Sequence, residues 1–388
     1  MRERRALALY LGSETLLSLG IGMVQYAQPF FYEAHAVGDA RIGILFSVNA
    51  LTGAFVALLL APLADKLGAS VAWKFATLLL AVSYLGMGLM HSYPWWLVTS
   101  AFAGAGGALL VSTENVVLSS LTSGTEKAHI FSRFVAMYMF CMGSGSVLAG
   151  FLAPHIGFRA VVLMGAAISL IAPCIRVFVR APDAKSHRAF RVPNRKMLWM
   201  SGFSLLFGMA PGLLSQFATL VLKNDYGAST EWTAIVSALA MFMVSVGSAT
   251  VSPLIRKIRQ GPTLAIAFAT TAGATAAQSF TPRFFPFAGL YLLRTASASI
   301  PQPIIDAAFL RNMEATEFSQ MFGLRVFGAN VGSAIGTAIG GNLLAHRQLK
   351  ALLWLSASLF VLAFVYITVL LRIVRRWPPP LDPLKMPQ

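Results

Sequence analysis

Long apolar runs alternate with short polar segments along the whole chain. Twelve runs are separated by connections that carry charge and turn residues. About 20 mostly apolar residues are the length that an α-helix needs to cross a bilayer. The pattern predicts twelve transmembrane helices, near residues 7–31, 42–64, 71–91, 95–120, 130–153, 157–179, 197–221, 231–254, 262–281, 285–308, 319–344 and 351–373.

Composition supports a membrane location and excludes a soluble domain. The 388 residues are 57% hydrophobic and 11% charged, whereas soluble domains carry roughly 25% charged residues. The net charge of +16 falls in short clusters between the apolar runs, so it does not indicate a nucleic-acid partner. Cys141 and Cys174 lie inside apolar runs, and no cysteine or histidine spacing indicates a metal site.

The longest connection divides the chain into two halves. It is polar and basic, and six predicted spans lie on either side of it. We expect an N-terminal six-helix bundle, a cytoplasmic linker, a C-terminal six-helix bundle and a cytoplasmic tail, at residues 1–179, 180–196, 197–374 and 375–388.

The distribution of basic residues predicts the orientation. With the N-terminus inside, the termini and the even-numbered connections hold 22 of the 30 lysines and arginines. The opposite connections hold six, and two more, Arg294 and Arg325, lie further within spans; basic residues near a span end are counted with the adjoining connection. Cytoplasmic segments carry the excess of basic residues, so both termini and the linker are expected in the cytoplasm.

Two connections at equivalent places in the halves resemble each other. Residues 61–70 read APLADKLGAS and residues 252–261 read SPLIRKIRQG. Pro62 and Pro253 are 191 residues apart, and the same offset relates further positions in both halves. These pairs are Lys66 and Lys257, Gln25 and Gln216, Glu126 and Glu317, Gly145 and Gly336, and Gly150 and Gly341. The halves are therefore parallel repeats.

Together these features resemble the major facilitator superfamily, and in particular its drug and metabolite exporters. The family motif after the second span stands here as residues 61–68, with Ala61 in place of the first glycine and Ala69 and Ser70 in place of the usual basic pair. The resemblance implies an all-α membrane fold of two pseudo-symmetric six-helix bundles. It also implies secondary transport by alternating access, with the substrate bound near the midplane between the halves.

Charged side chains within spans are the candidates for chemistry, because they are costly in lipid. Glu14, Glu114 and Asp306 are candidates for proton coupling. For the two glutamates the alternative is a structural ion pair or hydrogen bond near the cytoplasmic gate. For Asp306 the alternative is a pair with Arg311.

Arg294 and two glutamines are candidates for substrate binding. Arg294 lies close to the middle of its span. The N–H groups of its planar guanidinium suit an anionic substrate or a coupling acid. The alternative is a structural ion pair. Gln25 and Gln216 either bind substrate or join neighbouring helices. Arg325 lies about one turn inside its span, and we expect it to extend to the membrane surface.

Prolines and glycines predict irregular and closely packed helices. Pro211 and Gly212 are expected to weaken the seventh span, and Pro301 and Pro303 the tenth. In the eleventh span the glycines at four-residue spacing predict a close packing face; they are Gly328, Gly332, Gly336 and Gly340.

The leading functional hypothesis is proton-coupled export of a lipophilic or drug-like small molecule. The alternatives are an organic-anion importer or exchanger that uses Arg294, a lipid transporter, and a membrane scaffold or receptor without transport activity. We expect no enzymatic activity and no cofactor beyond an ion gradient. The expected setting is the bacterial inner membrane, with the lipid bilayer around a monomer.

The motif after the second span is expected to act as a latch. Gly68 permits a tight turn and Lys66 follows the cytoplasmic charge bias. In the family that this chain resembles, the acid at the position of Asp65 holds the cytoplasmic side shut through the end of a helix in the other half. We therefore expect Asp65 to meet the start of the eleventh span, near Ser319 and Gln320, in outward-facing states only.

Overall fold

The computed structural model describes residues 2–59, 68–122, 127–179, 194–310 and 318–374, which are helical almost throughout and contain no strand. By length and composition alone, seven helical stretches in these segments could span a membrane. They are Arg5–Ala34, Asp39–Leu59, Ala69–Leu89, Tyr93–Ser120, Arg133–Arg176, Thr230–Ile258 and Leu349–Ile373. The 44-residue stretch among them is long enough to cross twice.

Within the described residues, five helices form the N-terminal bundle. They are α1 (Arg2–Ala34), α2 (Asp39–Leu59), α4 (Ala69–Leu89), α5 (Tyr93–Ser120) and α6 (Lys127–Arg176). The predicted spans 130–153 and 157–179 together form α6, which reverses direction at Gly157. Gly157 has φ 81°, a left-handed conformation that glycine adopts without steric cost. One residue therefore connects two membrane crossings.

In residues 194–310 and 318–374, eight helices form the C-terminal bundle. They are α7 (Arg195–Gly212), α8 (Ala218–Asn224), α9 (Thr230–Ile258), α10 (Gln260–Gln278), α11 (Phe284–Ser299), α12 (Pro301–Leu310), α13 (Phe318–Ala345) and α14 (Leu349–Val374). Two predicted spans are each divided into two helices: α7 and α8 are separated at residues 213–217, and α11 and α12 at Ile300. Because Pro211 and Pro301 lie beside these breaks and proline lacks the helical N–H donor, the predicted weak points are confirmed.

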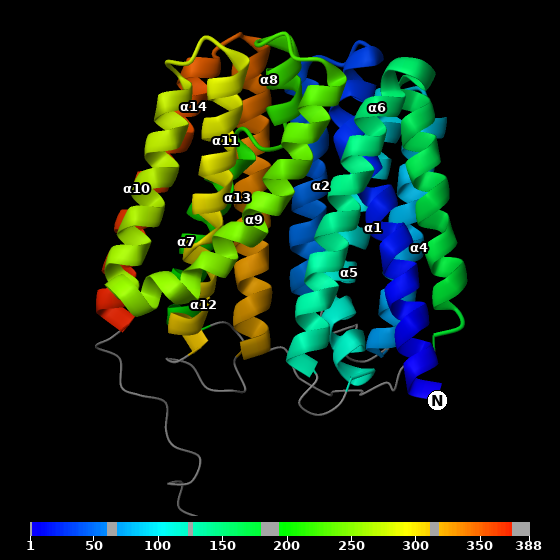
Figure 1. Cartoon of the computed structure of the whole chain (residues 1–388), viewed down its shortest axis with the longest axis horizontal. Coiled ribbons are helices and arrows are strands. Elements are labelled where there is room, and N and C mark those ends of the chain that lie inside the picture. The colour runs from blue at the N-terminus through cyan, green and yellow to red at the C-terminus, as the bar shows by residue number, and fades with distance from the viewer. Residues whose placement is uncertain (1, 60–67, 123–126, 180–193, 311–317, 375–388) are drawn as a thin grey trace, which may run out of the picture.

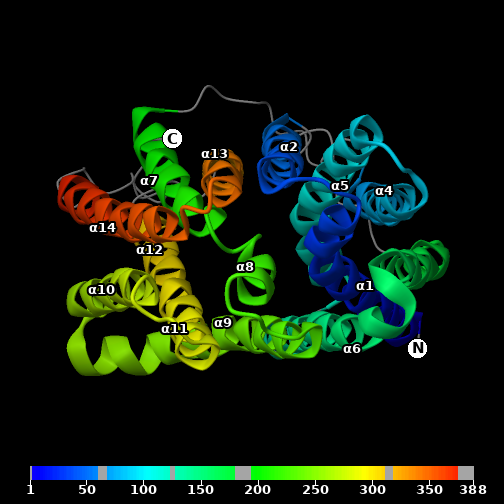
Figure 2. The same ribbon diagram turned by 90° about the horizontal axis from the view of Figure 1, so that it is seen from above.

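The helices run between two faces of the molecule. We call the face where α1 begins and α14 ends the near face, and the face where α1 ends and α2 begins the far face. The two bundles stand side by side, with the N-terminus at the near face (Figure 1). Seen from above, α8 lies between the bundles, while α2 faces α13 and α6 faces α9 (Figure 2).

Small residues allow the two bundles to approach closely. A Cβ atom at Gly43 of α2 would meet the backbone of Thr337 and Gly341 on α13. The Ser47 hydroxyl donates to the Ala334 carbonyl oxygen at 2.6 Å. Small side chains bring helix backbones into contact in this way within membranes, so backbone packing joins α2 to α13.

The glycine face of α13 packs against α7 of its own bundle. Cβ atoms at its four glycines would meet the backbone of Ser201, Leu205, Met209 and Leu213. The predicted packing face in the eleventh span is therefore confirmed, and it holds two helices of the C-terminal bundle together.

Candidate functional site

A cavity of about 970 Å³ lies between the bundles. Its walls come mainly from α1, α2 and α5, with contributions from α4, α6, α9 and α13. Many lining side chains are apolar or aromatic, and they include Phe46, Leu80, Tyr84, Met139, Met142 and Met241. Such a wall suits a substrate with substantial apolar surface.

Four polar positions predicted from the sequence line this cavity. They are Glu14, Gln25, Glu114 and Gln216. Gln25 lies on α1, whereas Gln216 lies in the turn between α7 and α8. Both repeat-related glutamines thus lie in the cavity wall, and a role in substrate binding stays a prediction.

Glu14 forms a buried ion pair with Arg176 at the end of α6. Glu14 is 3% exposed and Arg176 is fully buried. The Glu14 carboxylate also accepts a hydrogen bond from the Ser18 hydroxyl at 3.0 Å. The alternative of a structural ion pair at Glu14 is therefore the one that the structure shows.

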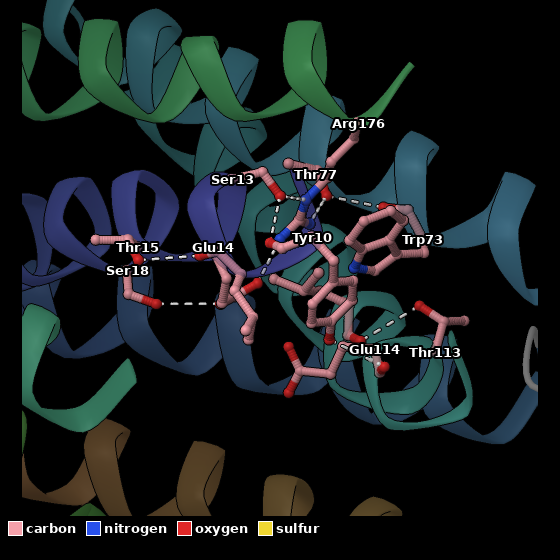
Figure 3. A network of polar contacts seen from close by, with 12 residues as sticks. Tyr10, Ser13, Glu14, Thr15, Ser18, Trp73, Thr77, Thr113, Glu114 and Arg176 are labelled. Carbon is pink, nitrogen blue, oxygen red and sulfur yellow. Dashed lines mark hydrogen bonds and ion pairs between the residues drawn. The ribbon is translucent and has the colours of Figure 1, made fainter. Parts of the chain in front are cut away.

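The rest of the Arg176 guanidinium is held by the same bundle. Its Nε donates to the Ser13 hydroxyl at 3.2 Å, and it also donates to the Thr77 hydroxyl. Its Cζ atom lies 4.1 Å from the centre of the Trp73 ring. Figure 3 shows these side chains converging on the arginine. A buried charge that is both paired and hydrogen-bonded in this way is stable away from water.

Sequence reasoning missed Arg176. It placed only Arg294 and Arg325 inside spans and counted every other basic residue as part of a loop or terminus. The structure instead directs the Arg176 side chain back into the N-terminal bundle. Glu14 is the one sign in the sequence of such a buried partner, because an acid inside a span requires a compensating group.

Glu114 lies beside the network of Glu14 and Arg176, but its carboxylate is not part of that network. The Tyr10 hydroxyl donates to the Glu114 backbone carbonyl at 3.1 Å, and Tyr10 stacks on Trp73 with ring centres 5.0 Å apart. In Figure 3 the Glu114 carboxylate has no contact drawn to another side chain. Within the described residues, its carboxylate oxygens have neither an ion pair nor a hydrogen bond. Glu114 is thus an acid of the cavity wall without a dedicated cation.

Asp306 and Arg325 form a second ion pair, between α12 and α13. The Arg325 side chain is 7% exposed, so the expectation that it extends to the membrane surface is wrong. Asp306 pairs across the bundle with Arg325, while its alternative partner Arg311 lies outside the described residues. Neither residue is among those that line the cavity in the described part of the chain. The structure therefore gives Asp306 a packing role in this state.

Arg294 is buried inside the C-terminal bundle. It is 2% exposed, and its Cζ atom lies 5.7 Å from the centre of the Phe360 ring. Its Nε and Nη2 atoms have no hydrogen-bond partner among the described residues. It is also absent from the described residues that line the cavity. The expectations that Arg294 contacts substrate in the cavity or pairs with an acid are therefore not met in this conformation, because its side chain is buried within the C-terminal bundle beside Phe360 of α14.

The predicted latch is described only in part. Asp65 and Lys66 lie outside the described residues, so their proposed contacts stay predictions. Gly68 directly precedes α4 and has φ 97° and ψ 133°, a conformation that favours glycine. The expected tight turn at Gly68 stays a prediction, because the residues before it lie outside the described residues.

The chemistry of the cavity is that of binding and proton exchange. No group of histidine, cysteine or carboxylate side chains that could hold a metal ion occurs in the described segments. A cavity between two helical bundles, with apolar side chains, acids and amides in its wall, is typical of a membrane transporter.

Comparison with known proteins gives the family. The chain matches the model of the Major Facilitator Superfamily over residues 11–293 and 200–387. It belongs to this family, whose members are transporters, and the predictions of the fold, of transport and of a non-enzymatic role are confirmed.

Individual relatives differ in what they carry. The chain is 21% identical over 365 residues to Multidrug resistance protein MdtG from Klebsiella pneumoniae (strain 342), covering 89% of this chain and 87% of that protein. The crystal structure of the nucleoside transporter NupG is similar with a TM-score of 0.75 and 12% identity, covering 97% of this chain and all of that one. A bacterial homologue of the iron transporter ferroportin in an inward-facing state has a TM-score of 0.76 and 16% identity, covering 95% of this chain and 98% of that one. At these identities the solved structures support the fold alone.

Proposed function

We propose that this protein is a proton-coupled exporter of lipophilic or drug-like small molecules that works by alternating access. The observation that carries the proposal is the pairing of charges in the cavity wall. Two carboxylates, Glu14 and Glu114, lie there, and Arg176 is committed to Glu14. Glu114 is left as the acid that can gain and lose a proton without breaking an ion pair.

The cavity wall and one relative support the substrate class. The described wall combines apolar side chains and the thioethers of three methionines with acids, amides and hydroxyls, and methionine adapts to ligands of different shape. The similarity to a protein named for multidrug resistance points the same way. A ligand of this class would bury its apolar surface against the methionines and direct a polar group towards Gln25, Gln216 or Glu114.

The distribution of basic residues supports an orientation in the membrane. We place the near face in the cytoplasm because the termini and the connections on that side carry 22 basic residues, against six on the other side. The protein would then lie as a multi-pass monomer in the bacterial inner membrane. The energy would come from the proton gradient, with no bound cofactor.

The test uses purified protein in proteoliposomes. A thermal-shift panel of lipophilic dyes, including rhodamine 6G, selects ligands, and each ligand is then tested for uphill movement driven by an imposed pH gradient. Glu114→Gln is expected to abolish uphill movement while retaining exchange of labelled dye across the membrane. Glu231→Gln is the matched control, because Glu231 is a partly exposed acid at the start of α9 and is not among the described residues that line the cavity.

Two results would contradict the proposal. If no dye moved under any ion gradient, export of lipophilic compounds would be wrong. If Glu114→Gln retained full proton-driven movement, Glu114 would not be the coupling acid.

A further inference from the structure

Two amide side chains of the N-terminal bundle line the cavity in the half nearer the far face. They are Gln28 of α1 and Asn49 of α2, and both are partly buried. Asn49 contacts Ser100 of α5, and Ser100 lies 14 positions before Glu114 on the same helix. This separation corresponds to about 21 Å along an α-helix. This part of the wall is therefore remote from Glu114.

A backbone contact fixes the orientation of the Asn49 amide. Its Nδ2 donates to the Ser100 carbonyl oxygen at 3.2 Å. A backbone carbonyl can only accept, so the nitrogen side of the amide faces α5. Helices α2 and α5 approach closely here, since a Cβ atom at Gly104 would meet the Asn49 backbone. The Asn49 Oδ1 atom makes no hydrogen bond to the described residues, so it is an acceptor without a donor.

A tyrosine fixes the Gln28 amide in a similar way. The Tyr32 hydroxyl donates to the Met87 Sδ at 3.1 Å and accepts from the Gln28 Nε2 at 3.1 Å. Tyr32 is fully buried, and its ring centre lies 5.7 Å from that of Trp96. A hydroxyl has a single hydrogen to donate, so the nitrogen side of Gln28 faces Tyr32. The Gln28 Oε1 atom has no donor within the described part of the chain.

Ser100 joins the two oriented amides into one network. Its hydroxyl lies 3.5 Å from the Tyr32 hydroxyl, and its carbonyl oxygen holds Asn49. Both amide nitrogens thus hold a partner within the protein, whereas both amide oxygens are left for a partner in the cavity. An amide oxygen is an acceptor only, so that partner must be a hydrogen-bond donor.

A second tyrosine adds a third oxygen to this part of the wall. Tyr84 lies on α4 one turn before Met87, whose sulfur binds Tyr32, and residues three apart share a helix face. Tyr84 lines the cavity, and its hydroxyl has no hydrogen bond in the segments that the structure describes. A phenol oxygen accepts as well as donates, so Tyr84 can bind the same donor group as the two amides.

We propose that Gln28, Asn49 and Tyr84 form a subsite for a primary amino group of the substrate. A primary ammonium carries three N–H donors and no acceptor, which matches three oxygens that lack a donor. The three side chains are uncharged, so they recognise N–H groups and not positive charge itself. The inference rests on the proposed function, and it narrows the substrate to lipophilic primary amines whose apolar part packs against the apolar side chains of the wall.

Tyr32 is a positioning residue of this subsite. It is not among the described residues that line the cavity, and it acts by holding the Gln28 nitrogen. Without the Tyr32 hydroxyl, the Gln28 amide is free to turn and to present either its nitrogen or its oxygen to the cavity. A variant that lacks only this hydroxyl therefore tests the orientation of the acceptor separately from the acceptor itself.

The experiment compares two ligands of equal charge. Naphthylmethylamine carries an ammonium group with three N–H donors near neutral pH, and its N,N,N-trimethyl derivative carries the same charge with none. Equilibrium dialysis measures the dissociation constant of each ligand for the purified full chain in detergent. The variants are Gln28→Met, Asn49→Leu and Tyr32→Phe. Asn342→Leu is the matched control, because Asn342 is an exposed amide of α13 outside the described cavity wall.

The subsite predicts a preference that depends on the amide oxygens. The parent should bind the primary amine about tenfold more tightly than the trimethyl derivative, equivalent to about 1.4 kcal/mol. Gln28→Met and Asn49→Leu should each remove most of this preference by weakening only the primary amine. Tyr32→Phe should reduce the preference through Gln28, and Asn342→Leu should leave it unchanged. An unchanged affinity for the trimethyl derivative in each variant shows that the cavity is intact.

Three results would overturn the subsite. They are equal affinities of the parent for the two ligands, binding of neither ligand to the parent, and a preference that survives in both Gln28→Met and Asn49→Leu. The last result would mean that ligand size or another group causes the preference. Because dialysis needs neither transport nor a proton gradient, failure of the subsite leaves the exporter proposal to the dye experiment in proteoliposomes.

Discussion

Removing Arg176 should strongly destabilise the N-terminal bundle. Arg176→Met leaves the Glu14 carboxylate almost fully buried without its cation. Removing one partner of a buried ion pair typically costs about 3–5 kcal/mol, mostly because the remaining charge is uncompensated. We expect a loss of this size in the free energy of unfolding.

The double variant Glu14→Gln with Arg176→Met separates the charge from the packing. Both hydroxyls that bind Arg176 keep another partner, since Thr77 donates to the Trp73 carbonyl at 2.8 Å and Ser13 to the Tyr10 carbonyl at 2.8 Å. Replacing a buried ion pair by neutral groups is often close to neutral in stability. The double variant should therefore recover to within about 2 kcal/mol of the parent.

The assay is reversible unfolding of the purified protein in mixed micelles by titration with sodium dodecyl sulfate, followed by tryptophan fluorescence. A single variant within about 1 kcal/mol of the parent would mean that Arg176 and Glu14 behave as a solvated pair. A double variant as unstable as the single one would show that packing of the arginine, and not compensation of Glu14, accounts for the loss.

Three further predictions concern the C-terminal bundle. Asp306→Asn should lower stability by about 1–3 kcal/mol, less than a fully buried pair because the Asp306 side chain is 26% exposed; the same micelle titration measures it, and no change would mean that Arg325 does not depend on the acid. Gly332→Ala should reduce stability by about 1–3 kcal/mol, since its Cβ would meet the Leu205 backbone. Gly289→Ala, where nothing lies within 4 Å, is the control, and equal stabilities would contradict the close packing. Arg294→Met should keep both the thermal stability and dye transport, because two of its buried nitrogens have no acceptor among the described residues; loss of transport with normal stability would return Arg294 to the binding site.

The membrane crossings could be predicted from the sequence because lipid imposes a simple rule. Each crossing needs about 20 apolar residues, and prolines mark the places where a helix loses a hydrogen bond. The breaks beside Pro211 and Pro301 follow from this local rule. The reversal of direction at Gly157 is harder to predict from the sequence. A single residue in a left-handed conformation connects the two crossings there, so no polar loop marks the boundary between them.

The pairing of charges could not be predicted, because it depends on which face each helix turns to its neighbours. The sequence identifies Glu14 and Glu114 as acids within spans, but it gives no sign that Arg176, near the end of its span, turns back to pair with Glu14. The surroundings of Arg294 could not be predicted for the same reason. Its depth in the membrane follows from its position in the sequence, but a helix surrounded by apolar groups gives no pattern that fixes its rotation.

The ion pair between Glu14 and Arg176 has a consequence for biosynthesis. The two residues are 162 positions apart, and a ribosome adds about 5–20 residues per second. Glu14 is therefore made about 8–32 s before its partner, and α1 meets the membrane while its acid lacks a counter-charge. Asp306 and Arg325 are 19 positions apart and are made within about 1–4 s of each other. The first helix of this protein thus depends on the last crossing of its bundle, whereas the second ion pair forms between segments that leave the ribosome almost together.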